Sequence, residues 1–345
     1  MIRMLAGLVA ALILALGALP AEAQKRDLEV PATSGWKHAN TGLILRSELA
    51  GLPRFELSDF GQAELDVAAR FGDNSTEITV YLFHPALASV PVWFDRSETA
   101  ILSRDIFGHA QPIGEAQAFA PPRSTVASAL RRAYKPGKGP YTATALAMMP
   151  MGEWLVGLRI SSSTLDSAQL DAKLTEAIAQ IGWPEGIADG PVAKAIAACA
   201  TPLAFSKRAR LKPPSMNDAL LSAMMPAVAA SEAEKGEAKP IGAYCRDATT
   251  TGSYGVYRWP EEPNGYLMAI GDNGRTISIA PGLSALIDKS PAFSVLYGDL
   301  DGSTAVYPPF NALPDPSKVM DALGKSHPIS SSDKGGKTIT ISTPK

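Results

Sequence analysis

The segment Thr76–His84, TEITVYLFH, carries β-branched and aromatic residues on both sides of an extended chain. It predicts a central strand, because both of its faces must be covered by other layers of the fold. Leu65–Phe71 precedes it with an alternating pattern, and Gly72–Ser75 is a turn signal between the two. The pair predicts an antiparallel hairpin in the middle of a covered sheet.

The rest of the first half alternates helix and strand patterns. Pro91–Phe107 has apolar residues at helical spacing, and Leu165–Trp183 has the strongest helical period in the chain. Between them, Tyr141–Met149 and Trp154–Ser161 predict a second hairpin. Strands, helix, strands, helix is an order that favours α+β folds. It is similar to the element order of PsbP/Mog1-like folds, in which helices sandwich a curved antiparallel sheet.

The second half begins with a short Ala-rich helix, predicted over Val192–Ala200. A β-meander with Asn-Gly and Asp-Gly turns follows, and a last helix is predicted over Ser317–Leu323. The five predicted strands of the meander are Tyr254–Trp259, Gly265–Gly271, Arg275–Ala280, Phe293–Tyr297 and Ser303–Tyr307.

A length of 345 residues fits about two domains. We expect a leader over residues 1–23, an N-terminal α+β domain over 24–188, a C-terminal α+β domain over 189–325 and a mobile tail over 326–345. In each domain, helices would pack on an antiparallel sheet.

The expected leader has the three regions of a secretory signal peptide. Arg3 precedes the uncharged apolar run Leu5–Leu19, and Ala21-Glu22-Ala23 is a small-x-small cleavage site. The pattern therefore predicts a periplasmic or secreted protein with no other membrane span. The alternative is an uncleaved membrane anchor, because the apolar run is at the short limit for crossing a bilayer.

The chain has two cysteines, Cys199 and Cys245. In an oxidising compartment an even count of two permits one intramolecular disulfide, which we predict here. The alternative is a pair of buried free thiols that pack as small apolar side chains.

Composition and motifs exclude several functions. Lys plus Arg is 32 and Asp plus Glu is 34, which gives none of the basic excess of a general nucleic-acid binder. Gly324-Lys325-Ser326 lacks the first glycine of a phosphate loop, and no His-Glu-x-x-His is present. Sequence analysis therefore assigns no catalytic, cofactor-binding or metal-binding residue.

One polar group is a candidate anion-binding site. Asp66 and Arg70 lie on one face of a predicted strand, and Arg159 lies on a strand of the same half. If these strands are neighbours, the three side chains form a charged patch. The alternative is a solvated sheet face with ordinary ion pairs.

These observations favour a non-enzymatic exported protein that binds an unknown envelope protein or ligand. The alternative is a hydrolase whose Asp and Glu residues meet His84 only in three dimensions. A cleft between the two halves with convergent Asp, Glu or His side chains would favour the enzyme.

Overall fold

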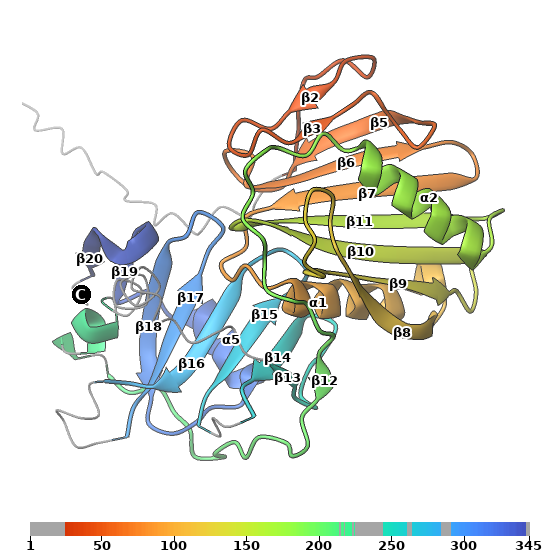
Figure 1. Ribbon diagram of the computed structural model, residues 1–345. Helices are drawn as coiled ribbons and strands as arrows, with labels where there is room; N and C mark the ends of the chain where they lie inside the picture. The colour runs from red at the N-terminus through yellow and green to blue at the C-terminus, as the bar shows by residue number, and fades with distance from the viewer. Residues whose placement is uncertain are drawn as a thin grey trace, which may run out of the picture.

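The computed structural model describes residues 25–213, 215–216, 218–222, 224, 244–260, 264–283 and 291–342. The predicted leader, residues 1–23, lies outside the described residues. Figure 1 shows two large sheets, one from each half of the chain.

The first sheet has nine strands and is antiparallel throughout. Both predicted hairpins are confirmed, and β7 pairs with β11, which joins them. Along the sheet the strands are β1 (Arg26–Asp27), β5 (Leu52–Asp59), β6 (Asp66–Gly72), β7 (Thr76–Phe83), β11 (Trp154–Ser162), β10 (Ala143–Met151), β9 (Ala129–Lys135) and β8 (Gln111–Phe119); β4 (Glu48–Leu49) pairs with β5, while β2 (Trp36–Lys37) and β3 (Ile44–Leu45) form a separate ribbon.

The central strand β7 is covered on both faces, as its sequence predicts. Ile78, Val80 and Leu82 pack in the core beneath helix α2 (Ser167–Gln180). Phe83 faces the other way, into the core around helix α1 (Val90–Ser103). Both helices begin at a capping side chain: Ser89 for α1, and Asp166 with the capping box of Gln169 for α2.

The second sheet also has nine strands, and its order follows the sequence. The five predicted strands of the meander are confirmed as β14 to β18, and the core under the sheet contains Val319 and Ala322 of helix α5 (Pro316–Lys325). The strands are β12 (Ala197–Ala198), β13 (Cys245–Arg246), β14 (Tyr254–Arg258), β15 (Tyr266–Ile270), β16 (Thr276–Pro281), β17 (Phe293–Gly298), β18 (Thr304–Phe310), β19 (Ser330–Ser332) and β20 (Ile339–Ile341). Short 3₁₀ turns lie at Asp105–Phe107 and Lys334–Gly336.

Helix α1 contacts both sheets (Figure 1). Trp93 shares a core with Tyr257 and Ala269 of the second sheet. The Arg96 side chain is 1% exposed and donates to three backbone carbonyls of that half: Gly271 O at 2.7 Å, Gly252 O at 2.8 Å and Thr251 O at 3.0 Å. Buried Asp95 accepts from Tyr257 Oη at 2.7 Å and from Arg246. One turn of α1 therefore fixes the second sheet against the first.

The predicted α+β class is wrong. The protein is mainly β, with 37% of the described residues in strands against 18% in helices. The helix expected over Val192–Ala200 is instead extended, and its Ala197–Ala198 segment pairs with β13 as β12. Pairing with β13 and burial of Ala193 against the α1 core outweigh the helix propensity of the alanines here, because intrinsic propensity is small beside tertiary contacts.

The division into domains stays a prediction. Strands β19 and β20 lie within residues 326–345, where a mobile tail was predicted, and β20 forms the edge of the second sheet. Among the described residues, none of the helices combines the length and the hydropathy needed to cross a bilayer.

The disulfide prediction is confirmed. Cys199 and Cys245 are bonded with a Cα–Cα distance of 4.8 Å, and 46 positions separate them in the sequence. Cys245 lies on β13, and Cys199 N donates to Arg246 O of the same strand. The bond thus holds the segment that enters the second sheet against the edge of that sheet.

Replacing both cysteines with serine is expected to lower the free energy of unfolding by about 3 kcal/mol, because the unfolded chain gains the freedom of a long loop. Urea denaturation of the double variant and of the unreduced parent would measure this loss. Reductant should shift the midpoint of the parent only. Equal midpoints for the two proteins without reductant would contradict the prediction.

Candidate functional site

A cleft with a cavity volume of about 430 Å³ lies between the first sheet, helix α1 and the β15–β16 turn of the second sheet. This volume is in the range of small-molecule sites. The lining residues are Phe60, Asp66, Tyr81, Phe83, Ser97, Ala100, Ile101, Arg104, Leu146, Met148, Gly157, Arg159, Asp272, Asn273 and Arg275.

Helix α1 supplies one wall through residues at helical spacing. Ser97, Ala100, Ile101 and Arg104 recur at i, i+3, i+4 and i+7, so they share one face. Arg96 lies one turn before Ala100, at the border of this face, and holds the second sheet. The same helix therefore positions the opposite wall of the cleft.

That opposite wall is the turn at 271–275. Arg96 Nε donates to Gly271 O, and Ala86 N donates to Gly274 O at 2.8 Å, so residues of the first half hold both ends of the turn. Gly274 has φ +83°, and a Cβ there would lie 2.6 Å from Leu300 Cδ2. Only glycine suits this position.

Strands β7, β10 and β11 form the floor. Tyr81 and Met148 flank Gly157, where an added Cβ would lie 3.3 Å from Met148 Cε and 3.6 Å from Tyr81 Cβ. The missing side chain leaves space in the middle of the floor. The surrounding surface is apolar and partly aromatic, with Phe83 and Ile101 beside it.

Two of the charged pairs around the cleft are satisfied within the protein. Arg275 Nε donates to Asp299 Oδ1 at 2.9 Å. Arg104 and Asp272 lie 3.7 Å apart at the mouth, with both side chains nearly half exposed.

Asp66 is different. Its carboxylate makes no hydrogen bond or ion pair within the described part of the chain. Burial raises its pKa to about 7, the charges of Asp272 and Asp59 add to that rise, and the Arg275 guanidinium opposes it. Asp66 therefore titrates near neutral pH. Its carboxylate is available to a cation or a hydrogen-bond donor in the cleft.

Arg159 is the second unmatched charge. Its guanidinium carbon lies 5.9 Å from the centre of the Tyr81 ring, a cation–π contact over the cleft floor. Among the described residues it has neither a carboxylate partner nor a hydrogen bond. All of its donors are available to an anion.

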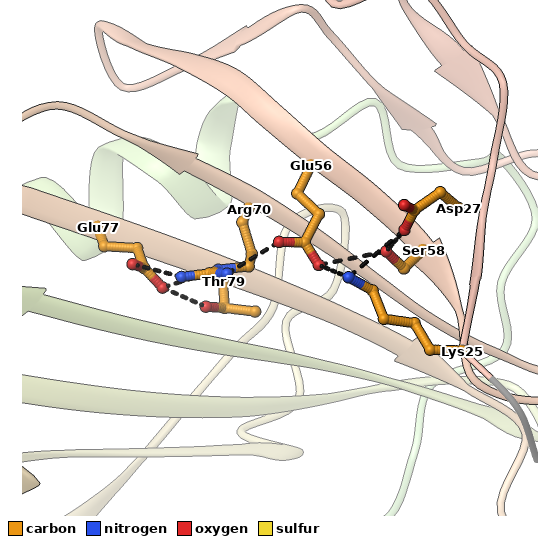
Figure 2. A network of polar contacts seen from close by, with 7 residues as sticks. All are labelled: Lys25, Asp27, Glu56, Ser58, Arg70, Glu77 and Thr79. Carbon is orange, nitrogen blue, oxygen red and sulfur yellow. Dashed lines mark hydrogen bonds and ion pairs between the residues drawn. The ribbon is translucent and has the colours of Figure 1, made fainter.

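Arg70 is engaged elsewhere. Its side chain donates to Glu77 at 2.9 and 3.1 Å and to Glu56 at 2.8 Å, and Glu56 in turn pairs with Lys25 (Figure 2). These contacts raise the pKa of Arg70. The structure thus brings Asp66 and Arg159 to one cleft and places Arg70 in a network at its side, so anion binding by the three residues together stays a prediction.

His84, which the hydrolase alternative requires, does not line the cleft. His84 Nδ1 bonds Leu300 O at 2.5 Å, and its Nε2 lies 3.7 Å from Glu153. Met148 faces the cleft, but Met149 packs in the α2-side core on the opposite face of β10. Within the described residues there is no group of His, Cys, Asp and Glu that could hold a metal.

Sequence reasoning missed Arg104, Asp272 and Arg275. The Asp-Asn-Gly sequence at 272–274 indicates a hairpin turn, and it is one. What the sequence lacks is any signal that this turn faces a strand about 200 positions earlier.

Comparison with family models, curated proteins and solved structures finds no match. The likeness of the first half to PsbP/Mog1-like folds therefore gains no support, and the cleft is interpreted from its own chemistry.

Proposed function

We propose that this is an exported binding protein that holds a small ligand in the cleft between its two sheets. The observation that carries the proposal is the pair of unmatched charges, Asp66 and Arg159, in a cavity of ligand size with a largely apolar floor. Polar groups without partners cost free energy when they are removed from water, and a ligand that satisfies them recovers it.

Two features support export. The predicted leader, residues 1–23, has the regions of a signal peptide. The disulfide Cys199–Cys245 is typical of proteins that mature outside the cytosol. We therefore place the protein in the periplasm or among secreted proteins.

The proposal is tested by blocking the cleft. Ala100→Leu adds side-chain volume from the cleft face of α1, and leucine keeps the helix preference of the position. Ala179→Leu makes the same change on an exposed position of α2 and is the matched control.

Isothermal titration against a panel of small carboxylates, phosphates, amines and zwitterions should identify a binder of the parent protein. Ala100→Leu is expected to weaken that binding at least tenfold, and Ala179→Leu is expected to leave it unchanged. If no compound binds, or if binding survives in Ala100→Leu, the cleft is not the ligand site.

The hydrolase alternative has one observation in its favour, the Asp66 carboxyl with a pKa of about 7 in a cleft. The lining carries Asp66 and Asp272 but neither His nor Glu, and Asp272 is paired with Arg104. Hydrolysis of generic esters or peptides that is lost in Asp66→Asn and kept in Ala179→Leu would replace the binding proposal with this one.

A further inference from the structure

The charges of the cleft can be matched one by one. Arg275 is paired with Asp299, and Arg104 with Asp272. One acid, Asp66, and one base, Arg159, are left over within the described residues. A ligand that carried only one charge would satisfy one of them and leave the other unmatched.

The two side chains are too far apart to satisfy each other. Asp66 pairs across the sheet with Phe83, and Arg159 pairs with Thr79 on the same strand β7. Four residues along a strand and two strand spacings across the sheet put their Cα atoms about 16 Å apart. The two side chains together reach only about 9 Å.

The space between them is apolar and open. Tyr81 and Gly157 face each other across β7 and β11 on the floor between the two charges. The Arg159 guanidinium leans over Tyr81 and thus toward the Asp66 end of the cleft. A short hydrocarbon chain or a flat ring fits such a floor without losing hydrogen bonds.

We infer that the ligand of this cleft is a small zwitterion, with its cationic group at Asp66, its anionic group at Arg159 and an apolar spacer of roughly 5–10 Å between them. This inference rests on the proposed function and specifies its ligand class. A protonated amine donates to the Asp66 carboxylate, and a carboxylate or phosphate accepts from the Arg159 guanidinium.

A simple anion and a zwitterion would favour opposite protonation states of Asp66. It would bind best when the Asp66 carboxyl is protonated, so its affinity would fall as the pH rises. A zwitterion needs the ionised carboxylate, so its affinity would rise. Because burial holds the pKa of Asp66 at about 7, the two cases differ most between pH 6 and pH 8.

The test uses three probes that share a six-carbon chain: 6-aminohexanoate, hexanoate and hexylamine. Calorimetric titration at pH 8 should give 6-aminohexanoate at least tenfold higher affinity than either singly charged probe. Between pH 6 and pH 8 its affinity should rise about tenfold, because the ionised fraction of Asp66 changes by that factor.

Two variants identify the ends of the ligand. In Asp66→Asn, the preference for 6-aminohexanoate over hexanoate should disappear together with the pH dependence. In Arg159→Gln, its preference over hexylamine should disappear. Ala179→Leu should keep both preferences.

Hexanoate that binds as tightly as 6-aminohexanoate, or an affinity that falls between pH 6 and pH 8, would overturn the inference and leave the proposed function standing. The same holds if the wider panel yields a cleft ligand that is not a zwitterion, whereas a zwitterion of another shape would support it. If no member of the panel binds, the proposed function itself falls.

Discussion

Replacing Arg96 with alanine is expected to lower the free energy of unfolding by about 5 kcal/mol. The guanidinium is buried and donates to three carbonyls, of Gly271, Gly252 and Thr251. Its removal leaves these carbonyls without their charged donor and leaves a cavity beside Gly255, where an added Cβ would lie 2.7 Å from the Arg96 side chain. Urea denaturation at pH 7 measures the loss.

Arg104→Ala is the matched control, because Arg104 lies at the end of the same helix. Its side chain is 44% exposed and its partner Asp272 is 3.7 Å away, so its loss should cost less than about 1 kcal/mol. Equal losses for the two variants would show that Arg96 does not fix the second sheet.

Replacing Asp66 with asparagine is expected to stabilise the protein at pH 8 by up to about 4 kcal/mol and to leave its stability at pH 4 nearly unchanged. Burial raises the pKa of this carboxyl from 3.8 to about 7. The stability that a raised pKa contributes is complete below pH 4 and is lost as the pH rises to about 7, because the folded state must then carry a buried charge. Asparagine has no such charge.

Asp73 provides the control of opposite sign. Backbone N–H groups of Ser75 and Thr76 donate to it and hold its pKa below the usual range. It contributes stability above pH 4 that is lost in acid, so Asp73→Asn should be less stable than the parent at pH 8. Unfolding curves at pH 4 and pH 8, with NMR titration of the Asp66 carboxyl, check both signs. A pKa of Asp66 below 5 would contradict the stabilisation expected for Asp66→Asn.

Local patterns predicted the elements that depend on near neighbours. The hairpin of β6 and β7 follows from alternation and a turn signal, and α2 follows from the spacing of its apolar residues. The helix predicted over Val192–Ala200 was wrong because the extended segment around Ala197 is set by a strand that lies almost 50 positions later, and by a disulfide to it. Helix preference carries no information about such partners.

The same distinction applies to the cleft. Asp66 and Arg70 could be placed on one face of a strand because alternation is local. Arg159 could be joined to them only on the condition that the strands were neighbours, because the pairing of β7 with β11 links two separate hairpins. Arg275 and Asp272 could not be added, since they come from the other half of the chain. The role of Arg96 had no sequence signal at all, because its acceptors are backbone carbonyls, which every residue has.

The position of α1 has a consequence for dissecting the molecule. A fragment that ends near residue 188 keeps the helix but presents Asp95 and Arg96 without their counter-groups, and the complementary fragment lacks the surface on which Tyr257 is buried. Neither piece is self-sufficient, so the two should reassociate when mixed. Proteolytic nicking of the connecting segment would therefore leave a non-covalent complex rather than two separate modules.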